Sequence, residues 1–189
     1  MKRDPRTVDA GNGIALAPRT PYDAAQMYDV IARHRDDLRT WLSWVDATHS
    51  AADVRRYAQF VAEQFEQRIG FDYAVVLDGA LVGGIGLHHV DWTQSSAAMG
   101  YWLSPEVRGR GIMTKATRAL TTHAFAALGL HRLEIRAVTE NRASRAVAER
   151  AGFQLEGVLR GALALHGRYR DCALYGMTAP EWRLEGSGR

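Results

Sequence analysis

Cysteine and long apolar runs are scarce in this sequence. Only Cys172 is present, so no intramolecular disulfide can form, and its apolar surroundings predict a small core residue instead of a nucleophile. No apolar run approaches the ~20 residues of a membrane-spanning helix, and the N-terminus lacks the apolar core of a signal peptide. These absences argue against disulfide-rich secreted and membrane-spanning classes. They predict a cytoplasmic protein with no membrane partner.

An excess of one charge is also missing. The formal net charge is +3, and the basic residues are spread along the chain, so we expect no specific nucleic-acid partner. Lysine occurs only at Lys2 and Lys115, so all the other Lys and Arg positions hold Arg. The planar fork of Arg suits bidentate phosphate contacts. Small anionic ligands therefore stay open, although a genomic preference for Arg would give the same bias.

Internal repeats and low-complexity linkers are absent as well. The chain has 189 residues, of which 47% are apolar and 24% charged, as in ordinary globular proteins. A chain of this length can bury about two thirds of its unfolded surface in one core. We predict one domain, 1–189, with a core of about 13–178; the first dozen residues and the tail 185–189 are expected to fray.

The first part of the chain has helical periodicity. A short strand over 14–17 precedes a helix opened by Pro21, and a second helix is predicted from Asp37, with Trp41 and Trp44 on one face. Ser50 to Asp53 forms an S-x-x-D cap for a third helix over 54–67.

The pattern then changes to strands. A hairpin around Asp78-Gly79 and a strand over 99–104 are followed by a helix, a strand, a short helix and a last hairpin around His166-Gly167. The predicted ranges are 73–77, 81–90, 99–104, 114–128, 133–139, 143–151, 153–165 and 169–177. This order predicts a mixed α/β fold with a mostly antiparallel, twisted sheet and helices on both faces; a pure Rossmann alternation does not fit.

The loop between Tyr101 and Thr114 carries the strongest chemical signal. It runs from a strand through Gly109 and Gly111 into a helix, where free backbone N–H groups and the helix dipole can hold phosphate oxygens. A Walker A loop needs Gly-Lys followed by Ser or Thr, and a dinucleotide loop needs a third Gly at Thr114, so both fail. The alternative is an exposed basic loop before a helix.

Several motifs in order resemble the GNAT superfamily of acetyltransferases. Its pyrophosphate loop is Gln or Arg, two residues, Gly, one residue, then Gly or Ala; Arg108, Gly111 and Met113 stand at these places. The departure at Met113 is common in the branch that acetylates ribosomal-protein N-termini. That branch also resembles this chain in the following stretches: Trp41-x-x-Trp44, Gly100 to Leu103, Asn141-x-x-Ser144, Val147 to Phe153, and Gly167-x-Tyr169-x-Asp171.

The resemblance implies acetyl-CoA as co-substrate and assigns a role to each motif. Leu103 N–H would stabilise the oxyanion, Asn141 would bind pantetheine, and Ser144 would protonate the departing thiolate. Helix capping is the alternative for Asn141 and Ser144. The implied CoA-binding residues are Trp102, Leu103, Ser104, Arg108, Gly109, Arg110, Gly111, Ile112, Met113, Thr114, Asn141 and Ser144.

The resemblance implies fewer residues for the side of the site that binds the acceptor amine. The family places aromatic residues beside the acceptor, here Trp41, Trp44 and Tyr101, although core packing would also explain the tryptophans. His88 and His89 are neighbours in a strand and point to opposite faces, so they cannot chelate one metal, but one of them could edge the cleft. No metal is expected.

The general base is the least defined part of the implied mechanism. Where the branch has an acid, this chain has Pro105, with Glu106 next to it, so Glu106 or water is the candidate. Deprotonating an α-amine at neutral pH costs about 1 kcal/mol, whereas Lys needs roughly 4 to 5 kcal/mol. A weak base therefore favours a protein N-terminus as acceptor. Open alternatives are a small-amine acetyltransferase, a non-catalytic CoA sensor and an RNA-binding module, as a monomer or homodimer.

Overall fold

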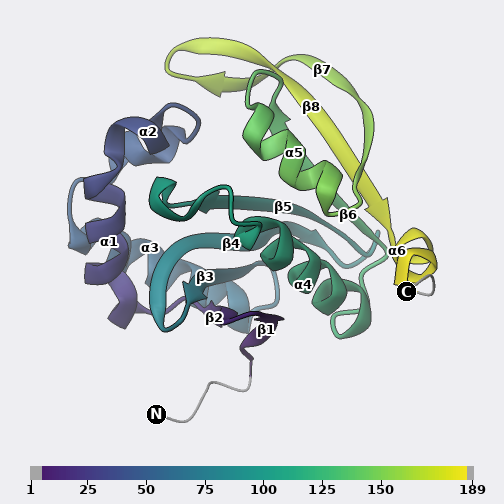
Figure 1. Ribbon diagram of the computed structural model, residues 1–189, viewed down its shortest axis with the longest axis horizontal. Helices are drawn as coiled ribbons and strands as arrows, with labels where there is room; N and C mark the ends of the chain where they lie inside the picture. Colours follow the sequence, from purple (N-terminus) through teal and green to yellow (C-terminus); the bar gives the residue numbers. More distant parts are fainter. Residues whose placement is uncertain (1–5, 187–189) are drawn as a thin grey trace.

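Eight strands of the described chain, residues 6–186, form one sheet in the computed structural model (Figure 1). The strand order is β1-β2-β3-β4-β5-β6-β8-β7, and only β5 and β6 run parallel. The strands are β1 Val8–Gly11, β2 Ile14–Pro18, β3 Phe71–Leu77, β4 Ala80–Asp91, β5 Ser96–Leu103, β6 Arg132–Val138, β7 Gln154–Leu165 and β8 Arg168–Thr178. The predicted mostly antiparallel α/β sheet is confirmed.

The helices begin where the sequence offers caps or loops. Ser50 accepts a hydrogen bond from the Asp53 N–H and begins α3, as its S-x-x-D pattern predicts. The α-helices are α1 Ala24–Arg33, α2 Arg35–Arg39, α3 Ala51–Glu66, α4 Ile112–Ala126, α5 Arg142–Arg150 and α6 Ala179–Gly186. Short 3₁₀ segments are η1 Pro21–Asp23, η2 Ser43–Ala47 and η3 Pro105–Val107.

Side chains of the sheet alternate between two cores. On β3, Tyr73 and Val75 pack in a cluster with Leu120 of α4, whereas Ala74 between them packs with Met27 of α1 and Val54 of α3. Because successive strand residues face opposite sides, α4 and α1 to α3 must cover different faces of the sheet. Helices on both faces are therefore confirmed. Cys172 of β8 is fully buried, as expected of a small core residue.

The predicted helix from Asp37 is wrong beyond Arg39. Helix α2 ends there, Leu42 has extended backbone angles, and η2 begins only at Ser43. The guanidinium of Arg35 donates hydrogen bonds to the carbonyls of Val45 and Thr48 and so holds the turned segment. Consequently Trp41 and Trp44 do not share a helix face.

The predicted fraying of the first dozen residues is wrong for Val8–Gly11. These residues form β1, and the turn to β2 uses Asn12 and Gly13, which both have positive φ angles. Asn-Gly is a sequence signal for such a hairpin. At the other end, α6 extends to Gly186, into the tail predicted to fray. Residues 1–5 and 187–189 of the two predicted segments lie outside the described residues.

Candidate active site

Strands β5 and β6 separate before they end, which opens the sheet. Their pairing runs from Ser96 with Arg132 to Met99 with Ile135, although β5 continues to Leu103 and β6 to Val138. At this opening lies a cleft of about 1230 Å³, bounded by the start of α4, by α5 and by the segments from α1 to α3. A parallel pair that splays apart leaves backbone groups of both strands free to bind an extended ligand.

The loop before α4 presents backbone donors to this cleft. Gly109 and Gly111 have φ angles of +75° and +72°, and a Cβ placed on either would meet no atom within 4 Å. Among residues 6–186, the N–H groups from Gly109 to Thr114 have no hydrogen-bond acceptor, and the buried Thr114 Oγ1 also lacks a partner. The positive end of the α4 dipole adds to these donors. This arrangement fits a phosphate-bearing ligand.

Arg108 ties this loop to its surroundings. Its Nη2 and Nε donate hydrogen bonds to the Leu103 carbonyl at 3.2 and 3.3 Å, and Nη2 lies 2.5 Å from Asp37 Oδ1. The side chain is partly exposed at the cleft wall. In this geometry the guanidinium fixes the loop against the end of β5 and against α2.

A hydroxyl pair lies on the opposite wall. The Tyr101 hydroxyl donates to the Ser144 carbonyl at 2.9 Å, and Ser144 Oγ lies 3.4 Å from the Tyr101 hydroxyl oxygen. Burial raises the pKa of Tyr101 to about 12, so its hydroxyl stays protonated at neutral pH. Asn141 Oδ1 accepts the Ser144 N–H at 3.1 Å and caps α5. The cap uses the Ser144 backbone and leaves its hydroxyl available to the cleft.

Tryptophans line the end of the cleft near α2. Trp44 of η2 and Trp102 of β5 meet edge to face, with ring centroids 5.9 Å apart, and Trp41 lines the same cleft from the turn after α2. Trp44 is 40% exposed, so the core-packing alternative does not account for it. Its free surface faces a cavity where an apolar part of a ligand can pack.

Most of the predicted site residues line this one cleft. They are Trp41, Trp44, Tyr101, Trp102, Leu103, Arg108, Gly109, Gly111, Ile112, Met113, Thr114, Asn141 and Ser144. Ser104 is buried beside it, with its N–H donating to the Val82 carbonyl, and Arg110 is exposed outside the lining. Glu106 is exposed in η3, where Oε1 lies 3.0 Å from His34 Nε2, and it does not line the cleft.

Several polar cleft residues carried no assignment as site residues from the sequence, and four of them lie together. Arg19, Tyr57, Asp72 and His88 come from separate segments and meet on the sheet face that α1 and α3 cover. The sequence signals for this group were the expectation that one of His88 and His89 could edge the cleft, and Asp72, a carboxylate next to the apolar Tyr73. His88 lines the cleft, whereas the exposed His89 does not.

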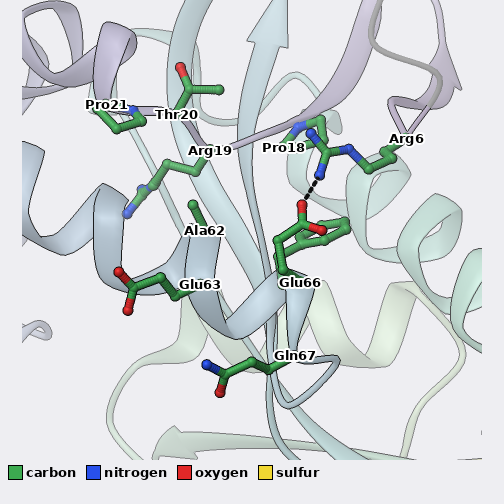
Figure 2. A pocket seen from close by; sticks show the side chains of 10 residues that line it. Arg6, Pro18, Arg19, Thr20, Pro21, Ala62, Glu63, Glu66 and Gln67 are labelled. Atoms are coloured by element: carbon green, nitrogen blue, oxygen red, sulfur yellow. Dashed lines mark hydrogen bonds and ion pairs between the residues drawn. The ribbon is translucent and has the colours of Figure 1, made fainter.

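A second, smaller hollow of about 350 Å³ lies between η1 and the end of α3. Figure 2 shows the Arg6 guanidinium pairing with Glu66 there, at 2.7 Å, while the guanidinium of Arg19 points away from this pair. Among the residues that the structure describes, no glycine-rich loop or hydroxyl pair lines this hollow. The larger cleft is therefore the candidate site.

Residues 6–186 contain no group of three or more His, Cys, Asp or Glu side chains placed to hold a metal ion. No helix in the same range is long and apolar enough to cross a membrane.

Comparisons with known proteins give a consistent result. The acetyltransferase (GNAT) domain family matches residues 14–154. YdaF of Bacillus subtilis (strain 168), provisionally named a ribosomal N-acetyltransferase, is 36% identical over 181 residues, covering 95% of this chain and 98% of YdaF. The ribosomal-protein-serine acetyltransferase of Escherichia coli (strain K12) is 30% identical over 169 residues, covering 89% and 94%. Mycobacterium smegmatis RimJ, solved with CoA-disulfide, superposes with a TM-score of 0.86 at 29% identity, covering 98% and 96%.

Proposed function

The chain belongs to the GNAT acetyltransferase family, and on this premise we propose that it transfers the acetyl group of acetyl-CoA to the N-terminal α-amine of a protein. The observation that carries the proposal is the donor-rich loop of Gly109 to Thr114 at the mouth of the splayed β5 and β6. A pyrophosphate bound to this loop would direct the pantetheine arm along β5.

The residues of the cleft supply the parts of a direct transfer. The loop N–H groups bind the pyrophosphate, Asn141 offers its amide N–H groups to pantetheine, and the N–H of Leu103 stabilises the oxyanion that forms at the thioester carbonyl. As the carbon–sulfur bond breaks, Ser144 Oγ gives its proton to the thiolate. The hydroxyl of Tyr101, 3.4 Å away, keeps Ser144 oriented. These assignments are consistent with one cleft that holds donor and acceptor together.

The proposed acceptor follows from two features. The tryptophan-lined end of the cleft offers apolar surface for the first residues of a peptide, and relatives that span nearly the whole chain are named for ribosomal proteins. A ribosomal protein N-terminus is the acceptor that we propose, in a cytoplasmic enzyme with a single catalytic domain. An α-amine also needs the least help from a base, about 1 kcal/mol at neutral pH.

A thiol-release assay with acetyl-CoA tests this proposal. Peptides with free N-terminal Ser or Ala, the same peptides with a blocked N-terminus, and small amines such as spermidine are compared. We expect turnover only with free N-termini, and mass spectrometry should locate the acetyl group on the α-nitrogen. Acetyl found on lysine side chains alone would contradict the acceptor, and absence of turnover with every amine would contradict the enzyme.

A further inference from the structure

We propose that His88 is the proton acceptor for the incoming amine. The inference rests on the proposed function and goes beyond it, because it assigns the base to a residue that the family motifs do not mark. The observations that carry it are the place of the imidazole in the cleft and the polar groups that surround it.

His88 lies on a part of the sheet where glycines replace side chains. Gly86 and Gly100, cross-strand partners on β4 and β5, share the face of His88. A Cβ placed on Gly86 would lie 3.1 Å from His88 Cε1, and one placed on Gly100 would lie 3.6 Å from His88 Nε2. The imidazole therefore lies over both glycines. Side chains at these positions would push it away from the floor of the cleft.

His88 lies at the vertex of the β5–β6 opening, where the two strands part. Met99 with Ile135 is the last pair between the two strands, and Gly100 is the first residue of β5 beyond it. An extended arm that enters between the strands ends near this vertex. Because His88 Nε2 lies beside Gly100, it is placed where an amine approaching from the α1 and α3 side would meet the thioester.

The charged neighbours of His88 come from several elements. On β3, the buried Asp72 pairs with Arg19 at 3.2 Å and accepts a hydrogen bond from the Tyr57 hydroxyl of α3 at 3.3 Å. His89 follows on β4. Burial, the largest effect, lowers the pKa of His88; Asp72 opposes this, and His89 and Arg19 add to it. A neutral imidazole at pH 7 can accept a proton, and the carboxylate of Asp72 stabilises the imidazolium that then forms.

The proton balance of the step is simple. The acceptor ammonium gives one proton to His88 Nε2, and the free amine attacks the thioester carbon. Ser144 protonates the departing thiolate and recovers a proton from the new amide nitrogen, which loses its second proton. His88 then passes its proton to solvent, so that the sum releases one proton. Glu106 is less suited to this work, because it is exposed and held by His34 and Arg33 outside the cleft lining.

The pH dependence of kcat tests the assignment, with a peptide bearing a free N-terminal serine as acceptor. Wild-type kcat should increase as the pH is raised toward 6.5 and should be level from pH 7 to 9, because kcat follows the ionisation of His88 in the complex. In His88→Gln, kcat at pH 6.5 should fall ~100-fold or more. The variant should then recover roughly 30-fold between pH 6.5 and 9, as the α-amine with a pKa near 8 loses its own proton.

Two further variants separate catalysis from folding. His89→Gln alters the adjacent exposed imidazole and should keep the wild-type profile; His88→Ala should regain part of its rate when free imidazole is added. CoA affinity, measured by calorimetry, should be unchanged in His88→Gln. A wild-type profile in His88→Gln, or a loss of rate that is equal at every pH, would overturn this inference and leave the acetyltransferase standing. Absence of wild-type turnover with every amine would overturn both.

Discussion

Asn141 and Ser144 form the N-terminal cap of α5, and this cap does not use the hydroxyl of Ser144. The cap joins Asn141 Oδ1 to the Ser144 N–H, and any residue other than proline at 144 would keep that N–H. The hydroxyl of Ser144 contacts only Tyr101 among the described residues. Capping uses the backbone of Ser144 and the proposed chemistry uses its hydroxyl, so the two alternatives left open by the sequence are compatible with each other.

Substitution at these two positions should separate the roles. We expect Ser144→Ala to lower kcat ~100-fold or more, because a positioned acid is removed, while CoA affinity and stability change little. Asn141→Ala is the matched control for the cap and should lower the free energy of unfolding by about 1 kcal/mol. Steady-state kinetics, calorimetry and urea unfolding measure these effects. A stability loss in Ser144→Ala with full turnover would contradict the assignment.

At the scale of elements, the start of α4 is defined by backbone conformation as much as by side chains. Gly111, the residue before the helix, is in the left-handed region, and so is Gly129, just beyond the other end of the helix. Around neither would an added Cβ meet an atom within 4 Å. The two glycines thus share backbone conformation and free space, but only Gly111 lines the cleft.

These two glycines give a controlled test of the CoA loop. Gly111→Glu should weaken CoA binding more than 100-fold, because a carboxylate would stand where the pyrophosphate binds, at the positive end of the helix dipole. Gly129→Glu carries the same backbone strain and the same charge but should bind CoA as the wild type does. Calorimetry with CoA measures both affinities. Equal affinities in the two variants would show that the loop does not hold the pyrophosphate.

Elements with a complete local signal could be predicted from sequence. The Ser50 cap, the Asp78-Gly79 turn and Gly152, which follows the end of the helix predicted over 143–151, each combine a special residue with a clear periodicity. The prediction of a helix through Trp41 was wrong because the backbone of Leu42 is extended. The contacts that hold this bend come from Arg35, which is a tertiary effect. The prediction that the first dozen residues fray was wrong for another reason. Asn12-Gly13 is a hairpin turn signal, but the polar composition of the segment outweighed it in the prediction.

At the scale of the whole molecule, the residues proposed for the donor side of the cleft form one continuous motif, and those proposed for the acceptor side do not. The loop from Arg108 to Thr114 is local, so its residues stay together in any fold that keeps the strand, loop and helix. Arg19, Asp72 and His88 become neighbours only through the register of β2, β3 and β4. A single sequence does not encode that register in its local pattern, so this part of the site needed the structure.

Stability of the entire fold should depend on pH through two partly buried histidines. Burial lowers the pKa of His88 in the cleft and of His123 in α4, whose ring lies 6.5 Å from the ring of Tyr73. As pH falls below about 6.5, the unfolded chain binds protons that the folded chain does not yet bind. The free energy of unfolding should therefore be highest above this pH and decrease from there toward the lower folded pKa values.

Urea unfolding between pH 7.5 and 5 measures this dependence. His123→Gln should flatten the slope, because one of the groups that differ between folded and unfolded chain is removed, and it should leave turnover intact since His123 lies outside the cleft lining. His49→Gln, at an exposed position, is the control for loss of a histidine as such. A slope in His123→Gln equal to that of the wild type would show that burial of this imidazole is not coupled to folding.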